Sequence, residues 1–241
     1  MKTPQIPGSK TPASQTPEEP PVALEVRDIA EDGRRWSPSV ARNRDIIRDT
    51  VLGILPKRAH VLEIASGTGE HGAHITASAE GLFWTYSDPD PESRQSQAAW
   101  ARAAGHGRLF GPHVIDTRAD GWSEIEGQVF DAIFTANMTH IAPFEATRGL
   151  FAGAGRHLRQ GGFLLLYGPF GRSGDMAASN RRFHESLRTR DPEWGVRDLD
   201  DDLLPLAPAS GLELVEVKAM PANNLMAVFK RVGTADGAIV P

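Results

Sequence analysis

The chain has 241 residues, which suits one domain with a sizeable hydrophobic core. Its 26 basic residues are outnumbered by 31 acidic ones, so a nucleic-acid partner is disfavoured. It contains no cysteine, which excludes disulfides, thiolate catalysis and cysteine-rich zinc sites. No apolar run approaches the length of a membrane span and the first residues lack a signal peptide, so we expect a cytoplasmic protein without a membrane partner.

Four segments can be distinguished along the chain. Residues 1–21 are rich in Pro, Thr, Ser and Gln, which predicts a disordered tail. Residues 22–56 predict a lid segment, in which a short strand or loop precedes an amphipathic helix over about residues 38–55. We expect residues 57–232 to form the main domain and residues 233–241 to form a flexible tail.

Strands and helices alternate from His60 onward, which predicts an α/β fold with a mostly parallel sheet and helices on both faces. We expect five strands in this part of the chain: His60–Ile64, Leu82–Ser87, His113–Ile115, Phe130–Ala136 and Phe163–Tyr167. Helices are expected from Glu70, over Glu92–Ala104 and Pro143–Arg159, around Phe183 and Leu187, and over Asp198–Ala207. Two final strands, Leu212–Ala219 and Asn224–Arg231, predict an antiparallel hairpin.

The stretch HVLEIASGTGEHG reads as a strand, a turn of small residues and the start of a helix. Gly67 and Gly69 have no Cβ, so the backbone is expected to approach a nucleotide-like ligand closely there. Asp88, Asp116 and Asn137 each follow a predicted strand. Because ligands of parallel sheets bind beyond the carboxyl ends of the strands, we expect a binding site at this edge.

The glycines Gly67, Gly69 and Gly72 spell G-x-G-x-x-G, and Asp88 follows about twenty residues after the turn, as in dinucleotide-binding proteins. Two features favour another ligand. Glu63 lies in the strand just before the turn, where a carboxylate suits a cationic amino group better than a pyrophosphate. We also expect no separate catalytic domain after the fifth strand. A nicotinamide dehydrogenase is therefore an alternative, which NAD binding in calorimetry would distinguish.

The pattern E-x-A-x-G-x-G, which starts at Glu63, resembles a class I S-adenosylmethionine-dependent methyltransferase fold, as do the acid after the second strand and the final hairpin. More narrowly, residues 36–232 resemble the methyltransferase-like 26 family. The blocks that carry this resemblance are SPSVARNRD, EIASGTGEH, SDPDP, ANMTHIAPFEAT, GLFAGAG, LYGPF, DPEWGVRDL and MPANN. The resemblance implies a Rossmann-like, mostly parallel seven-stranded sheet with a C-terminal antiparallel hairpin, an N-terminal helical lid and S-adenosylmethionine as the ligand.

The resemblance also implies roles around S-adenosylmethionine. The turn, with Ser66, Gly67 and Gly69, would pass under the methionine part and the ribose. Glu63 would support the turn or the amino group. Asp88 would accept hydrogen bonds from both ribose hydroxyls.

Four further residues are implied to contact the same ligand. Asp116 would accept from the adenine amino group, with Thr117 beside it. Arg42 and Asn43, on the polar face of the first helix, would reach the methionine carboxylate if that helix lies across the site. The alternatives are turn-starting aspartates at Asp88 and Asp116 and a solvated helix face for Arg42 and Asn43.

Three residues near the ends of the fourth and fifth strands are catalytic candidates. The side-chain oxygen of Asn137 would receive an amine donor or steady the sulfonium end, and Tyr167 offers a ring face and a hydroxyl. His140 is the candidate general base near neutral pH, with a packed histidine as the alternative. We expect no metal site.

The leading hypothesis is methyl transfer to a small-molecule acceptor, since positioning carries most of that work. An alternative needs no acceptor: the amino group of S-adenosylmethionine attacks its own γ-carbon, which closes azetidine-2-carboxylate and releases methylthioadenosine. A third hypothesis is a non-catalytic S-adenosylmethionine-binding protein. The sequence indicates neither the acceptor, the pathway nor the oligomeric state.

Overall fold

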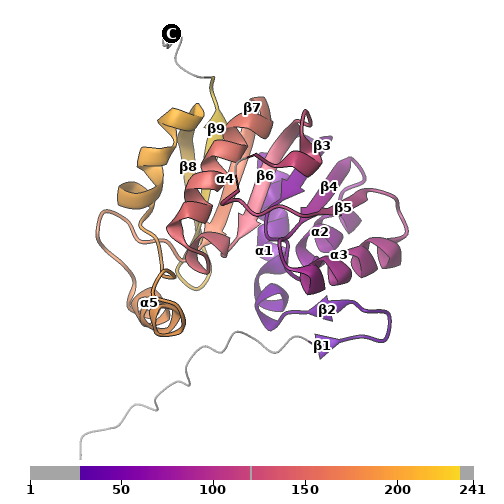
Figure 1. The fold of residues 1–241 in the computed structure, drawn as a ribbon, viewed down its shortest axis with the longest axis horizontal. Helices are drawn as coiled ribbons and strands as arrows, with labels where there is room; N and C mark the ends of the chain where they lie inside the picture. The colour runs from indigo at the N-terminus through magenta and orange to yellow at the C-terminus, as the bar shows by residue number, and fades with distance from the viewer. Residues whose placement is uncertain (1–27, 120, 234–241) are drawn as a thin grey trace, which may run out of the picture.

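The computed structural model of the protein describes residues 28–119 and 121–233 (Figure 1). The tails expected at residues 1–21 and over nearly all of 233–241 lie outside the described residues. Within the described residues, no helix is long and apolar enough to cross a membrane. The same residues contain no group of three His, Asp or Glu side chains arranged to hold a metal ion.

A seven-stranded sheet runs through the protein in the order β5-β4-β3-β6-β7-β9-β8. Strands β3 to β7 pair in parallel, and β9 and β8 complete the sheet as an antiparallel hairpin. The strands are β3 (Ala59–Glu63), β4 (Leu82–Ser87), β5 (Leu109–His113), β6 (Phe130–Ala136), β7 (Leu158–Gly168), β8 (Leu212–Met220) and β9 (Asn224–Arg231). The chain runs outward from β3 to β5 and then crosses back to β6, so the strand order reverses between β3 and β6. Ligands of such sheets bind at this point, beyond the carboxyl ends of the strands.

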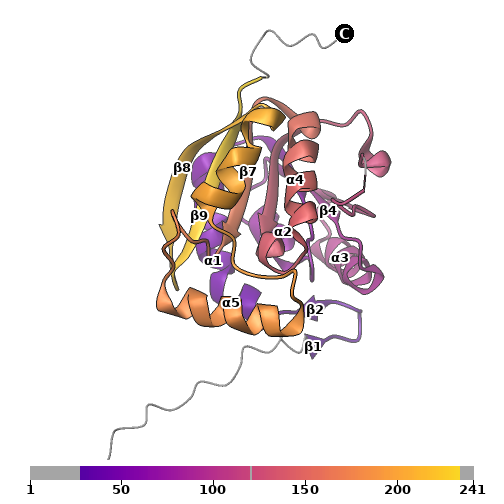
Figure 2. The same ribbon diagram turned by 60° about the vertical axis from the view of Figure 1, so that its left-hand side comes forward.

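Helices cover both faces of the sheet (Figures 1 and 2). The helices are α1 (Pro38–Ile54), α2 (Glu70–Ala77), α3 (Pro91–Ala104), α4 (Phe144–His157) and α5 (Ala178–Arg190). Shorter helical turns are η1 (Ser123–Ile125), η2 (Met138–His140), η3 (Leu199–Leu203), η4 (Leu204–Leu206) and η5 (Pro208–Ser210). A small hairpin of β1 (Asp28–Ile29) and β2 (Arg35–Trp36) precedes α1. In both views this hairpin and α5 lie below the sheet, at the same end of the molecule.

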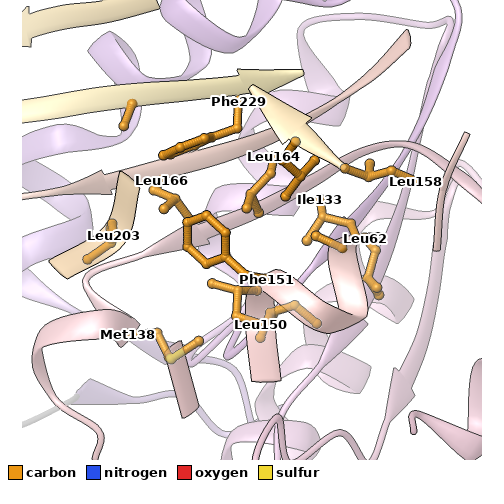
Figure 3. Packing of buried hydrophobic residues seen from close by; sticks show 14 of the residues in the cluster. Leu62, Ile133, Met138, Leu150, Phe151, Leu158, Leu164, Leu166, Leu203 and Phe229 are labelled. Atoms are coloured by element: carbon orange, nitrogen blue, oxygen red, sulfur yellow. The ribbon is translucent and has the colours of Figure 1, made fainter. Parts of the chain in front are cut away.

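The larger hydrophobic cluster lies between α4 and the sheet (Figure 3). Phe151 of α4 packs against Phe229 of β9 with ring centroids 5.1 Å apart. Three glycines let α4 come close to its neighbours, because a Cβ would overlap the Thr117 carbonyl at Gly149, the Trp122 ring at Gly153 and the Ser210 carbonyl at Gly155. The block GLFAGAG is thus explained by close helix packing. A second cluster, with Ile47, Val51, Trp84, Tyr86 and Phe134, lies between α1, α2 and the opposite face.

The predicted hairpin and most predicted strands are confirmed, with β4 and β6 at the expected bounds. The third strand was placed wrongly at His113–Ile115, because β5 runs over Leu109–His113 and pairs with β4. Its Gly111-Pro112 sequence reads as a turn, but a proline is tolerated in an edge strand. The helix expected over Asp198–Ala207 is instead a succession of short helical turns, of which the second contains Pro205 and the third begins at Pro208.

Candidate functional site

The turn between β3 and α2 has an unusual backbone. Ala65, Gly67 and Gly69 all have positive φ angles, of 53°, 56° and 88°. A left-handed alanine is strained, and such strain persists where surrounding structure enforces it, often at functional sites. A Cβ on Gly69 would lie 3.0 Å from the Gln97 Cα of α3. Gly69 is therefore required by its conformation and by protein packing, and its approach to a ligand stays a prediction.

Ser66 holds the turn against the ends of β3 and β4. Its hydroxyl donates to the Glu63 carbonyl at 3.0 Å and accepts from the Ser87 N–H at 3.1 Å. Its own N–H donates to the Ser87 carbonyl at 2.9 Å. These hydrogen bonds show that Ser66 shapes the turn, and a direct contact of Ser66 with a ligand stays a prediction.

Asp88 joins the end of β4 to the glycine turn. Its Oδ2 accepts from the Gly67 N–H at 2.9 Å, and its Oδ1 accepts from the Asp90 N–H at 2.9 Å. The side chain is buried, with 6% of its surface exposed. A carboxylate has about four lone-pair positions, so it can hold several hydrogen-bond donors at once. The residues of this edge therefore fit a ligand that presents two neighbouring hydroxyls, such as a ribose.

Glu63 supports the turn through its backbone while its carboxyl group lies inside the protein. Its carbonyl also accepts from the Ser87 hydroxyl at 2.7 Å, and its Oε2 accepts from Trp84 Nε1 at 2.9 Å. His71 Nδ1 lies 3.8 Å from Oε1. Burial raises the pKa of Glu63 to about 8, and burial lowers the pKa of His71 to about 4. Both shifts favour the neutral forms of the Glu63 carboxyl and the His71 ring inside the protein.

Glu63→Gln should reveal this buried proton. The folded protein holds the proton up to about pH 8, whereas the unfolded chain releases it near 4.5, so the native Glu63 loses stability as pH rises between these values. Glutamine has no such loss and can still accept from Trp84. We expect the stability of Glu63→Gln relative to the unaltered protein to rise by about 3 kcal/mol from pH 5 to pH 8.

Urea denaturation at pH 5, 6.5 and 8 measures this difference. Glu213→Gln, on the exposed face of β8, is the matched control and should show a constant difference. A constant difference for Glu63→Gln as well would mean that Glu63 is ionised in the folded protein.

One face of α2 holds helix α1 in place. Three side chains at the start of α2 each contact a different part of the α1 segment: Glu70 Oε2 accepts from the Ser37 N–H at 2.6 Å, His71 Nε2 lies 3.0 Å from Asn43 Oδ1, and His74 Nε2 lies 2.8 Å from Asp45 Oδ1. These pairs explain why two histidines and a glutamate share one helical turn.

Helix α1 also reaches the end of β7. Asn43 hydrogen-bonds the Tyr167 side chain; burial raises the pKa of Tyr167, and Asn43 and the Arg42 charge oppose that rise. The Asn137 N–H donates to the Tyr167 carbonyl at 2.8 Å, and Asn137 has a left-handed backbone with φ of 63°. The structure thus brings Arg42, Asn43, Asn137 and Tyr167 together where β6 and β7 end.

Tyr167→Phe tests this docking of α1. The change keeps the ring and removes the hydroxyl that contacts Asn43, at a cost of about 1 kcal/mol. Amide hydrogen exchange in α1 should therefore quicken by about fivefold, while the exchange of β3 and β6 stays unchanged. Unchanged exchange in α1 would show that the contact between Tyr167 and Asn43 does not hold α1 against the sheet.

Asp116 and Thr117 do not join this cluster. The Asp116 carboxylate is bound by the Arg118 guanidinium, at 2.6 Å from Nη2 and 3.0 Å from Nε, and this hydrogen bonding lowers its pKa. Thr117 is buried, and its carbonyl lies against Gly149. Asp116 thus forms an ion pair with Arg118 at the surface, and its contact with adenine stays a prediction.

His140 is fully buried and does not suit the expected role of general base. Its Nδ1 accepts from the Arg197 N–H at 3.2 Å, and its ring packs on Phe170 with centroids 4.6 Å apart. Burial, with the nearby Arg197 charge, lowers the pKa of His140 to about 3. A base of that strength inside the protein would hold a proton poorly near pH 7.

Two residues of the site were missed from the sequence. His71 lies two residues after Gly69, which puts it on the face of α2 that meets α1. Arg197 lies in the block DPEWGVRDL, and its guanidinium donates to the carbonyls of Thr139, Ala142 and Glu193 at 3.0, 2.8 and 2.7 Å. A single arginine in a loop gives no sequence signal for such contacts.

Comparison with protein families gives one decisive match. Residues 34–231 match the family model described as "Protein of unknown function (DUF938)". The chain belongs to the DUF938 family. This DUF938 domain therefore includes every element of the site described above.

Several solved structures with the same fold are methyltransferases. An O-methyltransferase family protein from Burkholderia thailandensis has a TM-score of 0.65 at 18% identity, covering 81% of this chain and 61% of that one. An O-methyltransferase family 2 protein from Planctomyces limnophilus DSM 3776, in complex with apigenin, has a TM-score of 0.66 at 19% identity, covering 80% and 60%. CalO1, a methyltransferase in calicheamicin biosynthesis in its SAH-bound form, has a TM-score of 0.64 at 19% identity, covering 79% and 54%.

These similarities establish the fold. The DUF938 chain has the Rossmann-like class I methyltransferase fold, with the predicted C-terminal antiparallel hairpin. It spans less than two thirds of the length of these three structures.

Proposed function

We propose that the protein binds S-adenosylmethionine and transfers its methyl group to a small-molecule acceptor. The observation that carries the proposal is the contact between Asp88 and Gly67, which places a carboxylate against the glycine turn at the reversal of strand order. The SAH-bound CalO1 structure shares the fold, which supports the choice of ligand. The resemblance of eight sequence blocks to the methyltransferase-like 26 family supports the same choice.

Different groups of residues would hold the two ends of the ligand. Asp88 would accept from the ribose hydroxyls, and the start of α2 would offer backbone N–H groups beside the turn. Arg42 and Asn43 would approach the methionine end, since they lie next to Tyr167. S-adenosylmethionine supplies a methyl group activated by a sulfonium. The protein's part is to orient the acceptor through Asn137 and Tyr167 and to exclude water through the docked α1.

Mass spectrometry of the products tests the proposal. The full chain would be incubated with S-adenosylmethionine alone and with a pool of small metabolites. Methyl transfer predicts S-adenosylhomocysteine and a methylated product only when the pool is present. Methylthioadenosine with azetidine-2-carboxylate in the absence of the pool would instead establish the cyclisation. Binding of S-adenosylmethionine with neither product would favour a non-catalytic binding protein, and no binding would refute the proposal.

A further inference from the structure

We propose that His140 is a fixed, neutral hydrogen-bond donor that turns the amide of Asn137, so that the site offers an N–H group to an ionised oxygen of the acceptor. This inference rests on the proposed methyl transfer and names its substrate class. The acceptors would be carboxylates and acidic phenols or enols, in place of amines and ordinary alcohols.

The first step is the position of the ring proton of His140. The Arg197 N–H donates to Nδ1 at 3.2 Å, so Nδ1 must carry a lone pair and the proton belongs on Nε2. The Gly195 carbonyl also lies near the ring and would favour a proton on Nδ1. If Nδ1 were protonated, however, its hydrogen would point directly at the hydrogen of the Arg197 N–H. Arg197 cannot easily turn away, because its guanidinium is held by three carbonyls.

The second step is the direction of the unused donor. Nε2 is buried and has no hydrogen-bond partner among the described residues. It lies against Gly168, where a Cβ would overlap it. The Asn137 Oδ1 faces the same position, 3.5 Å from that Cβ. An unpaired buried donor is costly, and Asn137 Oδ1 is an acceptor close to the same point of Gly168. When Oδ1 turns towards Nε2–H, the Nδ2–H groups of Asn137 point away from His140.

The third step is the lack of a base among the candidate residues. His140 is buried and neutral, burial raises the pKa of Tyr167, and the Glu63 carboxyl lies inside the protein. A site that offers a donor and no base selects an acceptor that is already ionised. The acceptor oxygen then uses a lone pair to form the O–CH₃ bond while the S–CH₃ bond breaks and leaves its electron pair on sulfur. No proton moves in this step.

Nitrogen-15 NMR of the full chain, labelled in the histidine rings and asparagine amides, tests the first two steps. We expect His140 to carry a proton on Nε2 and none on Nδ1 at pH 7. A proton on Nδ1, or on both nitrogens, would overturn the proposal. This measurement needs no ligand, so its result is independent of whether S-adenosylmethionine binds.

The substrate class is tested with benzoate and benzylammonium as probes of the protein saturated with S-adenosylhomocysteine. We expect benzoate to shift the Asn137 Nδ2–H signals and benzylammonium to leave them unchanged. No shift with benzoate, or a shift with benzylammonium, would overturn the assignment of an anionic oxygen. If S-adenosylhomocysteine itself does not bind, the proposed function fails, and that failure is seen before either probe is added.

Two variants separate positioning from packing. His140→Gln keeps an N–H donor near the place of Nε2, whereas His140→Leu fills similar space without one. The apparent affinity for benzoate should fall by about tenfold in His140→Leu and by less than about threefold in His140→Gln. Affinity for S-adenosylhomocysteine should be the same in both. Equal benzoate affinities in the two variants would mean that His140 does not position Asn137.

Discussion

Replacing Gly72 by alanine is expected to lower the free energy of unfolding by about 3 kcal/mol. The added Cβ would lie 2.5 Å from Trp84 Cδ1 and 2.6 Å from Tyr86 Cε1. Both rings are fully buried, and both are fixed by hydrogen bonds, from Trp84 to Glu63 and from Tyr86 to the Gly69 carbonyl. The rings therefore cannot move aside without disturbing the glycine turn.

Gly53→Ala is the matched control for this prediction. Gly53 lies in the exposed part of α1, and a Cβ there would meet no atom within 4 Å. Alanine should therefore stabilise the protein by about 0.5–1 kcal/mol through its better helix propensity. Denaturant unfolding of both variants measures the two changes. A Gly72→Ala protein as stable as the Gly53→Ala protein would show that α2 does not press on β4 as described.

Asp88→Asn is expected to weaken the binding of S-adenosylhomocysteine by about 100-fold, or roughly 3 kcal/mol. The variant loses one carboxylate oxygen, and with it either the bond to Gly67 or an acceptor for the ribose. Asp201→Asn, which changes an exposed aspartate of η3, is the control and should bind as the unaltered protein does. Isothermal calorimetry gives the affinities, and circular dichroism checks the fold. Equal affinities in the two variants would remove Asp88 from the binding site.

Most of the fold could be predicted because its strands are short apolar runs bounded by turn residues. Phe130–Ala136 is one such run, and it forms β6 at the expected bounds. The third strand could not be placed, because β5 is a half-exposed edge strand whose position is set by pairing with β4. Because Gly111 and Pro112 interrupt the strand, β5 shows no pattern of apolar residues that would reveal it.

The site could be predicted to the level of its backbone and less well for its side chains. Asp88 was placed correctly beside the turn, because the end of a parallel strand fixes its neighbourhood. The roles of Asp116 and His140 were not predictable, since they depend on Arg118 and Arg197, which the sequence does not link to them. The third glycine of G-x-G-x-x-G, Gly72, serves helix packing, so the motif alone did not identify the ligand.

Calorimetric titration of the full chain with S-adenosylhomocysteine, beside a parallel titration with NAD, tests the central claim most directly. The account predicts saturable binding of S-adenosylhomocysteine at one site and no heat from NAD. Binding of NAD alone, or of neither compound, would contradict the claim that this edge of the sheet holds an adenosyl sulfonium ligand.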